Sequence, residues 1–237
     1  MTRQIERLRP NQIRDALAKC SLIYLPLGTI EWHCEHLPIG LDALTAHGLC
    51  LNAAEETGGL VWPPLYYGTG GGHGGFPWTV MMPDETEIAA MIRHTLVRLS
   101  DLGVARVVLF SGHFAEAQLA MIDSIAAHWN STGKLTQVVA TAVNRAEIDG
   151  FPPDHAGLFE TTLLAGLAPE LVDINQLAPI AVQDSKLDRF DPASPIWGVV
   201  GADPREAAPM LPKALVDRVV GSLIDFVKLV DEKASRA

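Results

Sequence analysis

Residues 105–113 read ARVVLFSGH. The first six, residues 105–110, form the clearest strand of the chain, because an apolar, β-branched run is typical of a parallel sheet covered on both faces. Ser111, Gly112 and His113 form the turn that follows. A histidine is therefore expected at the carboxyl end of a central strand.

The segments on either side fit the same sheet. Residues 84–101 predict an amphipathic helix, whose apolar positions recur at three- and four-residue steps, namely Ile88, Met91, Ile92, Leu96 and Leu99. A second helix is expected after His113, up to about residue 130, and a second strand at 135–143. The order helix, strand, helix, strand is that of a parallel sheet with crossover helices.

The rest of the chain continues this alternation. The expected elements are a helix at 10–20, a strand at 21–28, and helices at 43–57, 157–167 and 211–233. Residues 169–204 are expected to be mostly irregular. The sequence therefore predicts the α/β class, as a single three-layer α/β/α domain over residues 1–237 with a mainly parallel sheet.

Composition excludes several classes of protein. The chain has 237 residues, of which 48% are hydrophobic, and a formal net charge of −10. No block of Lys and Arg is present, so neither nucleic acid nor an anionic membrane surface is an expected partner. No apolar run approaches the length of a membrane span. Three scattered cysteines, Cys20, Cys34 and Cys50, do not form a disulfide framework, and residues 1–19 lack the apolar stretch of a signal peptide, so a cytoplasmic protein is expected.

Residues that bind metals gather after three of the expected strands. They are Glu31, His33, His36 and Asp42 after the first, His113 after the second, and Asp154, His155 and Glu160 after the third. Open α/β sheets bind ligands beyond the carboxyl ends of their strands. Imidazole together with carboxylate suits zinc, manganese or iron. Glu31 and His33 project to the same side of an extended segment. The alternative is that the histidines are ordinary loop residues and that Asp42 caps the next helix.

Three further features of the sequence bear on function. Residues 70–75 satisfy the pattern G-x-G-x-x-G, but Phe76, Pro77 and Trp78 follow in place of a helix, which argues against a dinucleotide site. His73, within that run, is either a pocket residue or a hydrogen-bonded loop histidine. Cys34 lies beside the expected ligands, so a Cys–His nucleophile is conceivable.

Four segments together resemble the creatininase family. Residues 26–42, PLGTIEWHCEHLPIGLD, resemble its first motif, and residues 111–113 resemble its Asn-Gly-His. Residues 155–161, HAGLFET, resemble its His-Ala-Gly-x-x-Glu-Thr, and residues 67–79 resemble its loop ending in Phe-Pro-Gly-Thr. The chain departs from these motifs at Cys34, Leu41, Trp78 and Ala115.

The resemblance implies a metal-dependent amidohydrolase with an α/β/α fold that acts on a small molecule. It also implies a homo-oligomer, expected to be a hexamer, and two divalent metal ions per chain, with zinc expected and manganese or iron as alternatives. Carried over by position, Glu31, Asp42 and His113 would hold one metal. His33 and Asp42 would hold the other, so that Asp42 bridges the pair.

The resemblance leaves the second metal short of a ligand, because Ala115 stands where creatininase has a coordinating Glu. Glu160 and Glu116 are the candidates. Glu160 is favoured, because its motif is otherwise intact and because a carboxylate in the first turn of a helix is stabilised by the helix dipole. His155 and Glu160 are thus the expected catalytic residues, with His155 as the general acid.

Three functions remain open at this point. The first is hydrolysis of a small cyclic or linear amide, including formamides, by metal-activated water. The second is hydrolytic ring opening of a carbocyclic, dicarbonyl-like substrate. The third is a non-catalytic metal-binding protein. Two filled metal positions with room for water would favour an enzyme, and a closed four-ligand site would favour a structural role.

Overall fold

A parallel sheet forms the centre of the molecule. The computed structural model describes residues 2–177, 190–206 and 212–236. Its main sheet has four parallel strands in the order β2-β1-β5-β6. Their bounds are Leu60–Val61 for β2, Leu22–Leu27 for β1, Arg106–Ser111 for β5 and Gln137–Ala142 for β6. The predicted parallel sheet is confirmed.

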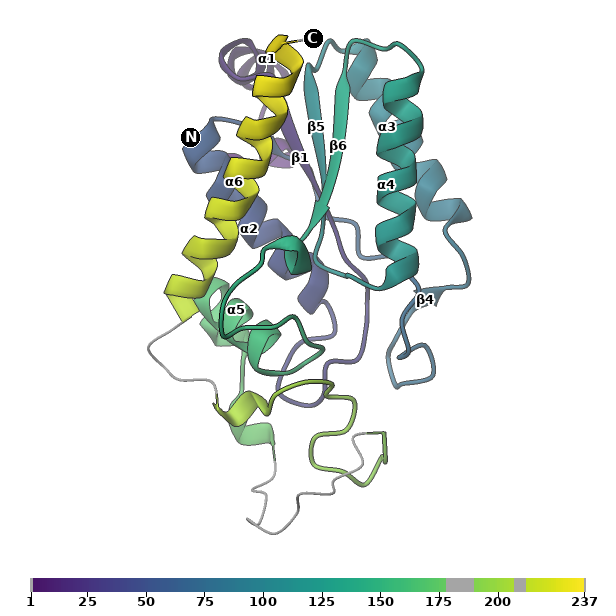
Figure 1. The fold of residues 1–237 in the computed structure, drawn as a ribbon, viewed down its shortest axis with the longest axis vertical. Coiled ribbons are helices and arrows are strands. Elements are labelled where there is room, and N and C mark those ends of the chain that lie inside the picture. The colour runs from purple at the N-terminus through teal and green to yellow at the C-terminus, as the bar shows by residue number, and fades with distance from the viewer. Residues whose placement is uncertain (1, 178–189, 207–211, 237) are drawn as a thin grey trace.

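Helices cover both faces of this sheet (Figure 1). On one face lie α3 (Thr86–Asp101) and α4 (Glu116–Ser131), and on the other α2 (Leu41–Thr57) and α6 (Pro212–Arg236). Alternate residues of β1 serve the two layers: Ile23 and Leu25 pack with α3 and α4, whereas Leu22 and Tyr24 pack with α2 and α6. The three-layer α/β/α architecture is therefore confirmed.

The remaining elements are smaller. In the described residues they are α1 (Pro10–Lys19), α5 (Leu158–Leu167) and a two-stranded parallel sheet of β3 (Gly68–Thr69) and β4 (Met81–Met82). Short 3-10 turns lie at Ile5–Arg7, Val143–Arg145, Pro169–Leu171, Ile174–Gln176 and Pro204–Glu206. As predicted, the described parts of residues 169–204 have no longer element. Within the described ranges, none of the helices combines the length and the apolar character that a membrane crossing requires.

Several boundaries differ from the prediction by one to three residues, and two of these differences have a clear cause. The helix expected from residue 43 begins at Leu41 with Gly40 as its N-cap, so the interpretation of Asp42 as the capping residue is wrong. Pro38 and Gly40 close a turn that starts the helix early, through the Leu41 N–H to Pro38 carbonyl bond of 3.1 Å. The strand expected from residue 135 begins at Gln137, because Leu135 is 99% exposed and has no neighbour to pack against.

The strands end level with one another, which positions the loops that follow. Leu27 of β1 pairs with Ser111 of β5, and Ser111 pairs with Ala142 of β6. The Gly112 N–H then donates to the Leu27 carbonyl at 2.8 Å. A Cβ built at Gly112 would overlap the carbonyl oxygen of Asp42. Glycine at position 112 therefore lets the end of β5 lie directly against the start of α2.

We expect Gly112→Ala to destabilise the fold, because the clash is with backbone atoms that no rotamer change can relieve. The expected loss is roughly 1 to 3 kcal/mol in the free energy of unfolding, measured in urea. Gly221→Ala in α6 is the matched control, since a Cβ there meets nothing within 4 Å. Alanine at that helix position is expected to be neutral or stabilising, by up to about 1 kcal/mol. Equal losses in the two variants would contradict the close approach.

Candidate metal centre

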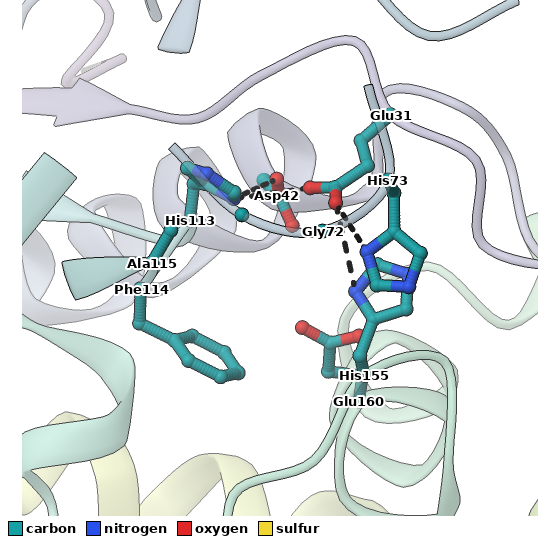
Figure 2. Close-up of a pocket in the computed structure, with 10 residues that line it drawn as sticks. Glu31, Asp42, Gly72, His73, His113, Phe114, Ala115, His155 and Glu160 are labelled. Carbon is teal, nitrogen blue, oxygen red and sulfur yellow. Dashed lines mark hydrogen bonds and ion pairs between the residues drawn. The ribbon is translucent and has the colours of Figure 1, made fainter. Parts of the chain in front are cut away.

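The loops that follow β1, β5 and β6 at the carboxyl edge of the sheet, together with the loop between β3 and β4, surround one cavity of about 150 Å³ (Figure 2). The predicted residues that line it are Glu31, Asp42, His113, His155 and Glu160, together with Gly71, Gly72, His73, Phe114 and Ala115. His33 is fully buried directly behind Asp42 and Glu160, with its Nε2 at 3.3 and 3.5 Å from them. The structure thus brings all six residues of the expected site together.

Asp42 occupies the middle of this group. Its Oδ1 lies 3.3 Å from His33 Nε2, and its Oδ2 lies 3.2 Å from His113 Nδ1. Glu31 Oε2 approaches the same His113 nitrogen at 3.0 Å. Glu160 Oε2 approaches His33 Nε2 at 3.5 Å. Each of the two histidines therefore faces Asp42 and one glutamate, and Asp42 is the carboxylate that the two halves of the site share.

Backbone carbonyls fix the tautomer of three histidines. His33 Nδ1 lies 2.9 Å from the Glu31 carbonyl oxygen, His113 Nε2 lies 3.2 Å from that of Gly70, and His155 Nε2 lies 2.8 Å from that of Trp32. Because a carbonyl only accepts, each of these nitrogens carries the hydrogen. The neutral rings then present His33 Nε2, His113 Nδ1 and His155 Nδ1 toward the carboxylates as lone pairs. Metal-binding histidines in proteins are commonly held in this way.

Several of the converging atoms lack partners. Glu31 Oε2, Asp42 Oδ2 and His33 Nε2 are buried, and none of them has a hydrogen-bond partner among the described residues. Buried polar atoms without partners cost free energy. A divalent cation placed among carboxylate oxygens and imidazole lone pairs would satisfy them, and this mixed set of N and O donors suits zinc, manganese or iron. The residues present therefore fit a metal centre.

The charges of the metal-free site support the same conclusion. Burial by itself lowers the pKa of His33, but the carboxylates of Asp42 and Glu160 outweigh it and raise that pKa to about 10. Burial raises the pKa of Asp42, but His33 and His113 outweigh it and lower that pKa to about 2. His113 likewise has its pKa raised by Asp42 and Glu31 against the effect of burial. Protons on the histidines thus supply the positive charge that a cation would bring.

The two glutamates and His155 differ in protonation. Burial disfavours the charge on Glu31, but contacts with His113 and His73 hold its pKa below the usual range. Burial and the neighbouring carboxylates of Asp42 and Asp154 raise the pKa of Glu160. Burial, reinforced by the charge on His33, lowers the pKa of His155 to about 3. His155 is therefore neutral near pH 7, with Nδ1 unprotonated.

Asp154 and His36 have supporting positions, whereas Glu116 lies outside the site. Asp154 accepts hydrogen bonds from the backbone N–H groups of Phe159 and Glu160, so it caps α5 and orients Glu160. His36 Nε2 lies 2.9 Å from Thr161 Oγ1, which ties the first loop to α5. Glu116, the competing candidate for the second metal, is exposed at the start of α4 and does not line the cavity.

His73 is the residue whose importance the sequence left undecided. Its Nδ1 lies 2.9 Å from Glu31 Oε1, and its ring lines the cavity. The glycine-rich run around it has no sequence period that would place it at the sheet edge, so only the tertiary structure reveals the contact. The same run leads to β4 in place of a helix, which agrees with the rejection of a dinucleotide site.

Two departures from the family motifs keep the backbone of a glycine. Cys34 has φ of 59° and Trp78 has φ of 61°, both left-handed, and both stand where the motifs have Gly. The loops therefore retain the conformation that glycine favours, at the cost of some strain. The Cys34 thiol faces the Pro195 carbonyl at 4.0 Å, and burial raises its pKa. Because Cys34 does not line the cavity, the structure gives no support to a Cys–His nucleophile.

Comparison with known proteins identifies the family. The sequence model of creatininase, described as creatinine amidohydrolase, matches residues 6–227. This chain belongs to the creatininase family. It is 27% identical over 190 residues to a creatinine amidohydrolase of Pseudomonas putida, covering 70% of this chain and 71% of the relative.

Other relatives carry names that point to different substrates. The chain is 29% identical to a 3-dehydro-scyllo-inosose hydrolase of Thermotoga maritima, covering 68% of this chain and 55% of that protein. It is 26% identical to a mycofactocin precursor peptide peptidase of Mycolicibacterium smegmatis, covering 68% and 65%. A crystal structure of creatininase superposes with a TM-score of 0.77 at 24% identity, covering 95% of this chain and 96% of that one. Other solved creatininase structures include a mutant of Zn-Zn type and a Mn form. The family is one of hydrolases with several substrate classes.

Proposed function

We propose that this chain hydrolyses a small carbonyl substrate, in the first place a cyclic or linear amide, with two divalent metal ions. The observation that carries the proposal is a set of buried atoms of Glu31, His33 and Asp42 that have no hydrogen-bond partner among the described residues. Around them, imidazole nitrogens and carboxylate oxygens face one another at 3.0 to 3.3 Å. Glu31, Asp42 and His113 would hold one ion. His33, Asp42 and Glu160 would hold the other, and zinc and manganese are the first candidates.

Such ions, when bound, act as Lewis acids that polarise a carbonyl and lower the pKa of water. The chain itself supplies the proton transfers. His155 Nδ1 is 4.0 Å from Glu31 Oε1, and the Trp32 carbonyl fixes its tautomer, so this nitrogen can accept the proton of the attacking water. It can then donate the same proton to the departing nitrogen, as a general acid. Phe114 and Ala115 form the opposite wall of the cavity (Figure 2).

The size of the cavity limits the reacting group. Its volume of about 150 Å³ corresponds to roughly five water molecules at about 30 Å³ each. A formyl group, a small lactam or one peptide unit fits such a space. The same space accommodates a ring ketone, the group that the relative from Thermotoga maritima suggests. A non-catalytic metal site is disfavoured, because the cavity leaves room for water and substrate beside the ligands.

The proposal is tested by a substrate screen on metal-loaded protein. The protein is reconstituted separately with zinc, manganese and iron. Turnover is then measured with cyclic amides, formamides, short peptides and ring ketones. Turnover of an amide that disappears when a chelator removes the metal supports the proposal. Turnover of the ketones alone would make ring opening the function. Metal-loaded protein that turns over none of the four classes would favour the non-catalytic alternative.

Metal binding is expected to release protons. In the metal-free chain the pKa values of His33, His113 and Glu160 are all raised by their surroundings, so these groups hold protons that a cation must displace. The association constant should therefore rise with pH, by up to about tenfold per pH unit for each proton displaced. Calorimetric zinc titrations at pH 6, 7 and 8, in buffers of different ionisation enthalpy, measure the association constant and the number of protons released. An affinity independent of pH would contradict this charge distribution.

A further inference from the structure

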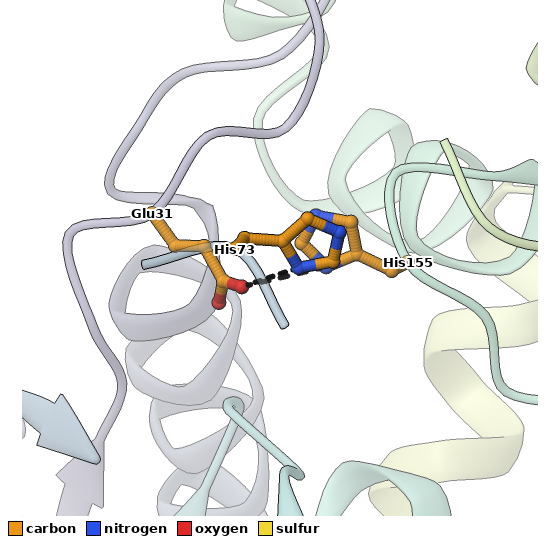
Figure 3. A group of neighbouring side chains, drawn as sticks. All are labelled: Glu31, His73 and His155. Carbon is orange, nitrogen blue, oxygen red and sulfur yellow. Dashed lines mark hydrogen bonds and ion pairs between the residues drawn. The ribbon is translucent and has the colours of Figure 1, made fainter. Parts of the chain in front are cut away.

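His73 makes two contacts inside the site (Figure 3). Its Nδ1 lies 2.9 Å from Glu31 Oε1. Its ring stacks on that of His155, with 3.8 Å between centroids and an interplanar angle of 13°. The side chain is buried, although it belongs to a glycine-rich loop that is otherwise largely exposed. One side chain thus touches both an expected metal ligand and the expected proton carrier.

The contact with Glu31 has a defined polarity. A carboxylate oxygen only accepts, so His73 Nδ1 carries the hydrogen and donates it to Oε1. The other ring nitrogen, Nε2, is buried and has no hydrogen-bond partner among the described residues, which is less costly for a lone pair than for an N–H group. Glu31 Oε1 is therefore engaged, while Oε2 is directed at His113 Nδ1, 3.0 Å away.

We infer that His73 is the positioning residue of Glu31: its Nδ1–H holds Oε1, so that Glu31 offers Oε2 alone to the cation it shares with Asp42 and His113. The inference rests on the proposed function, since it assigns a role to His73 within that metal centre. A carboxylate free to rotate could bind through both oxygens and would present a different number of ligand atoms. Hydrogen bonds of this kind orient ligands and tune metal affinity.

His73 is itself held in place by aromatic packing. The ring of Phe76 lies edge-on to that of His73, with 4.9 Å between ring centroids. The ring centroids of Phe76 and Trp197 are 5.0 Å apart. Trp197 packs on Trp32 at 5.2 Å, and the Trp32 carbonyl receives the hydrogen bond of His155. His73 is thus linked to His155 both by direct stacking and through the packed aromatic side chains. This packing restrains the imidazole of His73 in the orientation that reaches Glu31.

A separate cation bound by Glu31, His73 and His155 is the alternative reading of this group. The ligand atoms lie within 4.8 Å of one another. The two rings, however, are stacked almost parallel, so their in-plane lone pairs run side by side and do not converge on one point. The His73 nitrogen that faces the carboxylate is also the one that carries hydrogen. The geometry therefore favours a hydrogen-bond donor over a third metal site.

Substitutions of His73 can distinguish the role of its N–H donor from that of its aromatic ring. His73→Phe keeps the stack on His155 but removes the N–H group. His73→Asn removes most of the ring but can place its amide N–H where Nδ1 lies. His73→Gln places the amide at the Nε2 end, and it replaces the phenylalanine variant if that variant does not fold. His94→Phe, at an exposed histidine of α3, is the matched control.

The measurements are zinc affinity, by titration against a competing chelator, and the visible spectrum of the cobalt(II) form. We expect His73→Phe to weaken binding at the Glu31 position by about 10- to 100-fold, and His73→Asn to stay within about threefold of the unmodified chain. The cobalt bands should weaken in His73→Phe, because a second carboxylate oxygen raises the coordination number. His73→Asn and His94→Phe should retain the original spectrum.

The outcomes are distinct. If the unmodified chain binds metal and His73→Phe keeps the same affinity and spectrum, the inference is overturned while the proposed function stands. If His73→Asn loses as much affinity as His73→Phe, the ring and not the donor matters, which also overturns it. An unmodified chain that takes up neither zinc nor cobalt would overturn the proposed function, and the role of His73 with it.

Discussion

The Asp42→Asn chain is expected to bind at most one metal ion and to lose hydrolytic activity by roughly a thousandfold, since Lewis-acid stabilisation is worth several kcal/mol and each factor of ten corresponds to about 1.4 kcal/mol. Asp42 faces His33 with one oxygen and His113 with the other. Asparagine keeps the shape but has one oxygen and no charge, so it cannot serve both halves of the site.

Metal content by elemental analysis and turnover of the substrate found in the screen measure this effect. Glu116→Gln is the control, because Glu116 is an exposed carboxylate close to the site that does not line the cavity. That variant should retain full metal content and activity. An Asp42→Asn chain that still binds two ions with unchanged affinity would show that Asp42 is not the shared ligand.

Most of the fold could be predicted because it follows from local patterns. The run at 105–110 is short, apolar and β-branched, which favours a buried strand, and the helix before it shows the three- and four-residue period of an amphipathic helix. The errors fall at element ends, where local patterns compete with tertiary contacts. Leu41 and Asp42 join α2 because Pro38 and Gly40 turn the chain, and Leu135 stays outside β6 because no layer covers it.

The residues that gather at the candidate site could be predicted from the sequence, but their supporting contacts could not. Parallel strands place the segments after their carboxyl ends side by side. The sequence has Glu31, His33 and Asp42 after one such strand and His113 after the next, so their proximity could be expected. The carbonyls of Gly70 and Trp32, which orient His113 and His155, carry no signal in the sequence, since every residue has a carbonyl. His73 reaches Glu31 across a separation of 42 residues, which no local period encodes.

The position of Glu160 favours it over Glu116 as the remaining ligand of the proposed second metal. Its Oε2 lies 3.5 Å from His33 Nε2 and also accepts the backbone N–H of Ala156 at 2.6 Å. Asp154 caps the same helix and fixes the first turn that carries Glu160. Glu116 has no comparable contact with His33 among the described residues, and it points to solvent at the start of α4.

We therefore expect Glu160→Gln to lose one metal ion and most of the activity, by about a hundredfold or more, while Glu116→Gln keeps both. The amide oxygen of glutamine can still accept the Ala156 N–H, so the helix start should remain intact. In the metal-free state the variant should unfold no more easily than the unmodified chain, because it removes a buried carboxyl whose pKa is already raised by burial. Metal content, activity and urea unfolding are measured on both variants. If Glu160→Gln binds two ions with unchanged affinity and Glu116→Gln does not, Glu116 and not Glu160 completes the second metal site.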